Sequence, residues 1–226
     1  MNHLKQVQEW MKVNNLDFFI INRTDEFLNE SIASYAERLF WISNFSGSAG
    51  RAIILQKKAA IFIDGRYTFQ AHQQVNIQDF SIEHLKDYWN WFGNNIEVDT
   101  KVGIDPSLHS NTEIKKIKTI VKKKQSTIKY LEENPIDIQW HNQPSYPQSK
   151  AFIHEKKYSG RSTKDKLHEI QSVLKSKSID YYLLTSLDSI AWLLNIRGND
   201  ILNTPLLLSF AIVPLNGKIE FFVDNV

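Results

Sequence analysis

The chain has 226 residues, of which 42% are hydrophobic and 23% are charged, and its net charge is +2. These values are typical of globular proteins, and the length suffices for one large core or two smaller ones. The small net charge argues against nucleic acid as a partner, because such proteins usually concentrate basic residues on one face. The lack of cysteine excludes disulfides and thiol chemistry. No apolar run approaches the ~18 residues that span a bilayer, so we predict a cytoplasmic protein with no membrane segment.

The N-terminal segment predicts a helix followed by a strand. Its apolar residues recur at helical spacing: Leu4, Val7, Trp10 and Met11. Residues 16–21, which are apolar except for Asp17, then have the composition of a buried strand. We expect a long polar loop at residues 22–38 and a further strand or turn at residues 40–42.

The segment Gly47–Gly50 precedes a predicted β-hairpin formed by residues 52–55 and 59–63. A phosphate-binding loop needs a helix after its glycines, whereas strand-like residues follow these. We therefore predict a tight turn, in which glycine supplies a positive φ or lets two backbones approach. Arg66 comes just after the hairpin and is expected at the rim of the sheet. The residues alone leave two roles open for it: a local ion pair, with Asp64 or a neighbouring glutamate, or recognition of peptide oxygen atoms.

Beyond the hairpin, short helices and strands are expected to alternate. A helix is predicted to begin at residues 68–74, residues 80–92 are aromatic-rich and of uncertain type, and residues 102–104 predict a strand. An amphipathic helix covers residues 114–121. Its lysines lie mostly off the apolar face, which favours a solvated surface, with a docking patch as the alternative: Lys115, Lys116, Lys118, Lys122, Lys123 and Lys124.

The second part of the chain repeats the pattern of the first. NLDFFIINRTDEF, from Asn15, aligns with SIDYYLLTSLDSI, from Ser178, and WISNFSG, from Trp41, aligns with WLLNIRG, from Trp192. The same register pairs Gln8 with Gln171, Asp17 with Asp180, and Asp25 with Asp188. A repeat of this size indicates duplicated domains. We predict a first domain at residues 1–140, a linker rich in proline and polar residues at 141–163, and an incomplete second domain at 164–226, within a longer protein.

The residues by themselves supply no complete active site. The histidines show no HExxH or other close metal-ligand spacing, and the nucleophile motif GxSxG is missing. We therefore assign no catalytic residue and no metal ligand to this chain, which is interpreted as a two-domain α/β scaffold.

Five ordered motifs resemble the N-terminal part of the three-domain Xaa-Pro aminopeptidases (aminopeptidase P). They are ERLFWISNFSGSAGRAIIL, AAIFIDGRYTFQA, VGIDP, YSGRSTKDKL and LDSIAWLLNIRGNDI. The resemblance runs from about Leu4 to Val226. It implies two tandem creatinase/prolidase N-terminal-type domains, each a mixed β-sheet flanked by helices with ribonuclease-H-like topology, the second truncated.

The resemblance also implies a function. The whole enzyme removes the N-terminal residue that precedes proline, and it uses two divalent metal ions, usually manganese, in a C-terminal catalytic domain. This chain would be the non-catalytic region that shapes and gates the substrate cleft. Its expected partners are a peptide with proline in second position and its own catalytic domain, and a homodimer of the full-length protein is left open.

Within the family, the arginine of the DGR(Y/F) turn contacts the bound peptide, and Arg66 matches this arginine. Asp64 and Tyr67 of the same turn, and Arg197 in NIRGND, are weaker candidates for substrate binding.

Two segments depart from the family pattern. The usual Ser-Glu-Tyr reads Asn29-Glu30-Ser31, which puts a contact by the missing tyrosine in doubt. The usual Trp-x-x-Arg-Pro has Gln143 in place of arginine, which removes a candidate interdomain ion pair. Two alternative functions stay open: a stand-alone interaction module derived from such an enzyme, and a fragment of a creatinase- or prolidase-like hydrolase. The duplication argues against the second, because those relatives usually carry one such domain.

Overall fold

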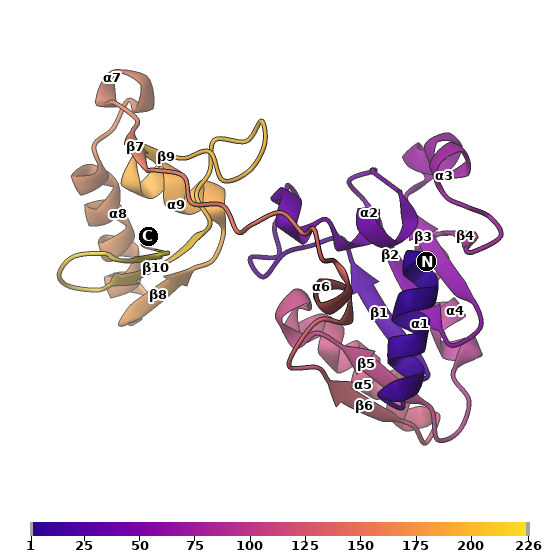
Figure 1. The fold of residues 1–226 in the computed structure, drawn as a ribbon. Helices are drawn as coiled ribbons and strands as arrows, with labels where there is room; N and C mark the ends of the chain where they lie inside the picture. The colour runs from indigo at the N-terminus through magenta and orange to yellow at the C-terminus, as the bar shows by residue number, and fades with distance from the viewer. Residues whose placement is uncertain (1, 225–226) are drawn as a thin grey trace. The chain divides into compact units, whose positions relative to one another are not determined.

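A computed structural model describes residues 2–224, and this part of the chain divides into two compact units (Figure 1). One unit comprises the chain up to Glu30 together with Tyr35–Pro144. The other comprises Ser31–Ser34 and the chain from Ser145 onward. Each unit has its own sheet and its own hydrophobic core.

The first unit is a mixed α/β structure. Its helices are α1 (His3–Val13), α2 (Arg38–Ser43), α3 (Thr68–Gln74), α4 (Tyr88–Asn95), α5 (Asn111–Lys123) and α6 (Pro135–Gln139). Its strands are β1 (Phe18–Asn22), β2 (Gly50–Leu55), β3 (Ala59–Ile63), β4 (Ser81–His84), β5 (Lys101–Ile104) and β6 (Thr127–Tyr130). Short 3₁₀ turns lie at η1 (Ser34–Ala36), η2 (Gly65–Tyr67), η3 (Leu85–Asp87) and η4 (Pro106–Leu108).

The six strands form one sheet in the order β4-β3-β2-β1-β5-β6. Strands β1, β2 and β3 make an antiparallel meander, whereas β4 runs parallel to β3, and β5 and β6 run parallel to β1. The mixed sheet expected from the family resemblance is therefore confirmed. Because β1, β3, β4, β5 and β6 all point the same way, the segments that follow them emerge at one edge of the sheet.

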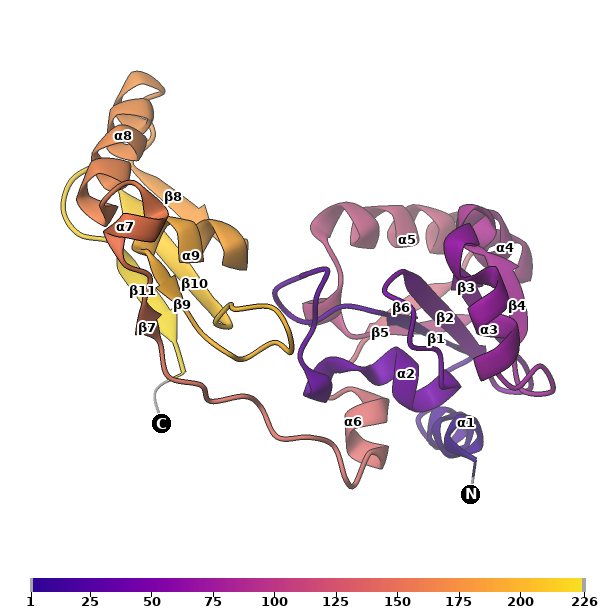
Figure 2. The same ribbon diagram turned by 90° about the horizontal axis from the view of Figure 1, so that it is seen from above.

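Helices cover both faces of this sheet (Figure 2). Side chains of α1, α2, α3 and α6 pack on one face, and those of α4 and α5 pack on the other. Strands β1 and β3 are buried on both faces, which explains why their residues are almost all apolar and do not alternate with polar ones. The helix predicted from Leu4, Val7 and Met11 is confirmed as α1, and these three side chains are buried.

Several expectations for the first unit need correction. Residues 40–42, expected as a strand or turn, belong to helix α2, which ends at Asn44 in the left-handed conformation (φ 61°). A helix this short cannot be told from a strand by periodicity. The aromatic segment at residues 80–92 contains β4, η3 and the start of α4. Strand β6 and helix α6 were missed.

The second unit contains fewer elements. Its helices are α7 (Lys156–Ser159), α8 (Thr163–Ser176) and α9 (Leu187–Leu194), and its strands are β7 (Phe152–Ile153), β8 (Tyr181–Leu184), β9 (Ile196–Arg197), β10 (Ser209–Pro214) and β11 (Glu220–Val223). Strands β11, β10 and β8 form one sheet, and β7 pairs with β9. Since β7 and α7 lie within residues 141–163, that segment is partly ordered; the domain bounds given above stay predictions.

The internal repeat extends to individual hydrogen bonds. Strand β1 pairs with β2 so that Phe18 faces Leu55, and β8 pairs with β10 so that Tyr181 faces Pro214. The Gln8 side chain donates to the Leu55 carbonyl (2.8 Å), and the aligned Gln171 donates to the Pro214 carbonyl (3.1 Å). The two copies therefore contain the same structural unit, as the aligned sequences predict.

Within the described residues, the second copy has no counterpart of part of the sheet that completes the first. Tyr181 and Leu183 on β8 are 68% and 58% exposed, whereas the aligned Phe18 and Ile20 are 3% and 2% exposed. In the first unit, α4, β5 and α5 cover the aligned side chains. Within residues 2–224, the second unit has no counterpart of these three elements.

Candidate functional site

The turn after β3 holds three of the four residues that the sequence analysis selects. Asp64 caps η2: its Oδ1 accepts from the backbone N–H of Arg66 (3.0 Å) and from Arg66 Nε (2.8 Å). These hydrogen bonds, the side-chain bond first, lower the pKa of Asp64, so this carboxylate stays ionised. The local ion pair considered as one role of Arg66 is therefore present.

The pair with Asp64 uses only one edge of the Arg66 guanidinium. The Arg66 side chain is 72% exposed, and among the described residues neither of its terminal nitrogens has a hydrogen-bond partner. A guanidinium held at Nε keeps a forked pair of donors that can bind a carboxylate or carbonyl. The turn therefore presents a charged, oriented group to solvent, and the ion pair and ligand recognition are compatible.

Tyr67 joins this turn to the Gly47–Gly50 segment. Its hydroxyl and the Ser48 hydroxyl are 2.7 Å apart, and its ring meets the Phe45 ring edge to face, with centroids 5.8 Å apart. The hydrogen bond with Ser48 lowers the pKa of Tyr67. The two turns thus form one connected rim at the edge of the sheet.

Phe45 explains the glycines, and the explanation differs from the one expected. Among the described residues, a positive φ at glycine occurs only at Gly160 and Gly217. A Cβ at Gly47 would lie 2.3 Å from Phe45 Cζ, and one at Gly50 would lie 2.9 Å from Phe45 Cε1. Both glycines are therefore needed to make room for a buried aromatic ring. The rejection of a phosphate loop is supported, because β2 begins at Gly50.

Sequence reasoning missed Arg23, which ties the polar loop after β1 to the same rim. Arg23 Nη1 donates to the carbonyls of Glu30 (3.0 Å) and Ser48 (3.4 Å), and Nη2 donates to Glu37 Oε1 (2.9 Å). Burial raises the pKa of Glu37, and the Arg23 charge opposes that shift. The signal was available, because Arg23 directly follows a buried strand as Arg66 closely follows β3.

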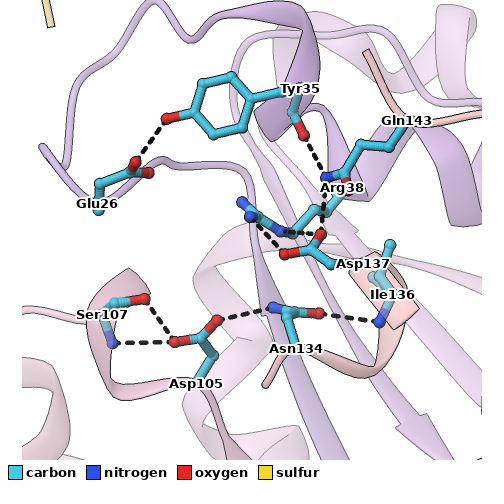
Figure 3. Close-up of polar contacts among 9 residues, drawn as sticks. All are labelled: Glu26, Tyr35, Arg38, Asp105, Ser107, Asn134, Ile136, Asp137 and Gln143. Carbon is cyan, nitrogen blue, oxygen red and sulfur yellow. Dashed lines mark hydrogen bonds and ion pairs between the residues drawn. The ribbon is translucent and has the colours of Figure 1, made fainter. Parts of the chain in front are cut away.

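Gln143 replaces the arginine that the family pattern has in the linker, and its bonds lie inside the first unit (Figure 3). Its Nε2 donates to the carbonyl of Tyr35 (2.9 Å) and to Asp137 Oδ1 (2.9 Å). Asp137 also accepts two hydrogen bonds from the buried guanidinium of Arg38, at 2.7 and 2.8 Å. The end of the first unit is therefore fastened to α2 by a partly buried ion pair.

Arg197 lies in the second unit and is half-buried. Its Nη1 donates to the carbonyls of Ala191 (3.2 Å) and Ile196 (2.8 Å), which fixes it against the end of α9. Among residues 2–224, no three histidine, aspartate or glutamate side chains gather closely enough to hold a metal ion. In the same part of the chain, no helix combines the length and the apolar character needed to cross a membrane.

Comparison with known proteins now defines the class. The model of the creatinase/prolidase N-terminal domain matches residues 3–133, and a second model of that description matches residues 142–226. The chain belongs to the creatinase/prolidase N-terminal domain family, with two such domains in tandem.

The similar proteins narrow the assignment further. The chain is 33% identical to a probable Xaa-Pro aminopeptidase P of Paracoccidioides brasiliensis, over 93% of this chain and 35% of that protein. It is 34% identical to a protein of the same description from Aspergillus flavus, over 98% of this chain and 34% of that protein. A solved X-prolyl aminopeptidase from Caenorhabditis elegans, described as a cytosolic enzyme with a di-nuclear active site, superposes with a TM-score of 0.90 at 26% identity, covering 99% of this chain and 39% of that one. The chain thus spans about a third of the length of these curated relatives.

Proposed function

We propose that this chain is the non-catalytic N-terminal region of a metal-dependent Xaa-Pro aminopeptidase, and that it shapes and gates the cleft where peptides with proline in second position bind. The similarity to such enzymes over nearly the whole chain supports this assignment. In the proposal, the two divalent metal ions, manganese as the expected metal, are bound by the catalytic domain, and the enzyme works in the cytoplasm. A homodimer of the full-length protein stays a prediction.

One observation carries the role of Arg66 in this proposal. Its guanidinium is exposed, is oriented through Nε by Asp64, and keeps its terminal nitrogens available. Such a group can bind a carbonyl or carboxylate of the peptide, with Asp64 and Tyr67 as positioning residues. Arg197 is a weaker candidate, because its Nη1 already donates hydrogen bonds to two backbone carbonyls.

The experiment is Arg66→Ala and Arg66→Lys in the full-length enzyme, assayed with an Xaa-Pro peptide. Loss of a charge-assisted contact worth about 1.5–3 kcal/mol lowers kcat/KM roughly ten- to a hundredfold. Lysine keeps the charge but loses both the fork and the Nε bond, so it should restore little. An unchanged kcat/KM in Arg66→Ala would remove Arg66 from the site. Lys86→Ala, an exposed cation of the neighbouring turn η3, is the matched control.

A stand-alone interaction module remains the alternative. The reading frame beyond Val226 separates the two: a following segment with two aspartates, one histidine and two glutamates as metal ligands supports the enzyme. A stop codon directly after Val226 favours the module.

A further inference from the structure

A pocket of about 370 Å³ opens in the first unit between the N-terminal ends of α4 and α5, beside β2. None of the four residues of the Asp64–Tyr67 turn lines it. The lining residues that matter for its chemistry are Arg51, Tyr88, Trp89, Ser110, Glu113 and Lys116. The pocket therefore combines hydroxyl groups, cations, aromatic rings and one carboxylate, that of Glu113.

Tyr88 is the residue that indicates a missing partner. It is 1% exposed, and its hydroxyl makes no hydrogen bond of ordinary geometry with any described residue. The nearest guanidinium, that of Arg51, lies over the ring face, 4.5 Å from the centroid. Burial raises the pKa of Tyr88, and the nearby Arg51 guanidinium opposes that shift only in part, so the hydroxyl stays protonated. Because Arg51 is itself a donor, its proximity does not give the Tyr88 proton an acceptor. A buried hydroxyl without a partner is costly, and a native structure normally supplies one.

The charges around this hydroxyl favour an anion. Glu113 is already neutralised, because it accepts from Arg51 (3.0 Å) and Asn22 (3.3 Å) and lies 3.4 Å from His109. Lys116, by contrast, has no carboxylate partner among the described residues; its Nζ lies 4.2 Å from the centroid of the Trp89 ring. An ammonium over an aromatic face remains free to bind an anion.

Helix α5 adds donors of its own at the same place. Ser110 caps the helix by accepting from the N–H of Glu113, and the pocket lies against this first turn. The first N–H groups of a helix lack intrahelical partners and attract negative charge. Tyr88, Lys116 and the first turn of α5 thus line one pocket and carry hydrogen-bond donors. Its other lining residues are the apolar Leu85 and Trp89, the paired Arg51 and Glu113, and Thr112.

We propose that this pocket binds a small molecule that carries an oxyanion, phosphate or carboxylate, on an apolar group. The oxyanion accepts from the Tyr88 hydroxyl and Lys116 and lies at the start of α5, and the apolar group packs on Leu85 and Trp89. The proposal is independent of the role of Arg66, because the two sites share no lining residue.

The test is calorimetric titration of the full-length protein with phenyl phosphate, with benzoate, and with neutral benzyl alcohol. Saturable binding of either anion with a dissociation constant at or below ~1 mM, and binding of the alcohol at least tenfold weaker, are the expected results. Stronger binding of phenyl phosphate identifies a phosphate ligand, and stronger binding of benzoate identifies a carboxylate. Binding of the alcohol as tight as that of the anions, or no saturable binding of any probe, overturns the proposal.

Three variants locate the site. Tyr88→Phe removes only the hydroxyl and Lys116→Ala only the surface cation, and each is expected to weaken anion binding at least about tenfold. Lys115→Ala, the same charge change one residue away on α5 and outside the pocket lining, should bind as the wild type does. Thermal unfolding without ligand confirms that each variant is folded. If both pocket variants bind as tightly as Lys115→Ala, the anion binds elsewhere and the proposal is wrong.

Discussion

Replacing Asp25 with asparagine is expected to change how the stability of the first unit depends on pH. Asp25 lies in the loop after β1 and is fully buried. Its Oδ1 accepts from the N–H groups of Phe27 and Asn29, both at 3.1 Å, whereas its Oδ2 has no partner among the described residues. Burial raises the pKa of Asp25 from 3.8 to about 6, and the backbone hydrogen bonds only partly oppose the shift.

The sign and size of the effect follow from this shift. Because the folded protein holds the proton more tightly than the unfolded chain, the associated stability is fully present below pH 3.8 and is lost as the pH rises through about 6. The whole difference corresponds to about 3 kcal/mol, at ~1.4 kcal/mol per pKa unit. Between pH 4.5 and pH 7.5 the loss from this one group is about 2 kcal/mol.

Asp25→Asn keeps the Oδ1 acceptor but cannot ionise. Its amide nitrogen is left unpaired, which costs about 1–3 kcal/mol at every pH. We therefore compare how much the free energy of unfolding, measured by urea titration, falls between pH 4.5 and pH 7.5. This fall should be about 2 kcal/mol smaller in the variant than in the wild type. Glu133→Gln removes an exposed carboxylate and serves as the control. Parallel pH profiles for wild type and Asp25→Asn would refute the reasoning.

Two further predictions concern packing and charge in the first unit. Gly47→Ala places a methyl group against Phe45 and should reduce the free energy of unfolding by about 1–3 kcal/mol in urea titrations. In the control Gly93→Ala, the new methyl group makes only ordinary contact in helix α4, and the free energy of unfolding should rise by about 0.5–1 kcal/mol. Equal effects of the two substitutions would contradict the steric argument. Asp137→Ala leaves the Arg38 guanidinium buried without its carboxylate and should cost about 3–5 kcal/mol by the same measurement, whereas a loss below ~1 kcal/mol would show that the pair behaves as an exposed one.

The elements that the sequence predicted well are those whose signal is local. Helices α1 and α5 have apolar residues at helical spacing, and β2 and β3 are short apolar runs separated by a polar turn. Helix α2 and strand β6 are short, and their conformations depend on packing and on pairing with β5. Periodicity over so few residues does not discriminate between the two states.

The candidate site divides in the same way. The DGRY turn could be found because its residues lie within four positions of the sequence, and the two hydrogen bonds between Asp64 and Arg66 each span two residues. The position of Arg23 directly after a buried strand could have marked it as a candidate, but its contact with Ser48, across 25 residues, is made only in the folded structure. The pocket beside β2 joins residues from β2, η3, α4 and α5, so no local pattern indicated it, and the sequence analysis grouped Lys116 with the solvated lysines.

Asp25 and Asp188 show that the sequence repeat does not determine the pKa of an aligned residue. The alignment of the two repeats places them at the same position, and it established by itself that one unit occurs twice. Yet burial raises the pKa of Asp25, whereas Asp188 is exposed. The pKa of Asp188 is lowered, mainly because its carboxylate accepts a hydrogen bond from the Ser186 hydroxyl. The repeated sequence gives the same strand pairing in both copies, β1 with β2 and β8 with β10. The aligned apolar residues set the register of these strands. The desolvation that tunes a charge depends on everything packed around it, and only the tertiary structure supplies that.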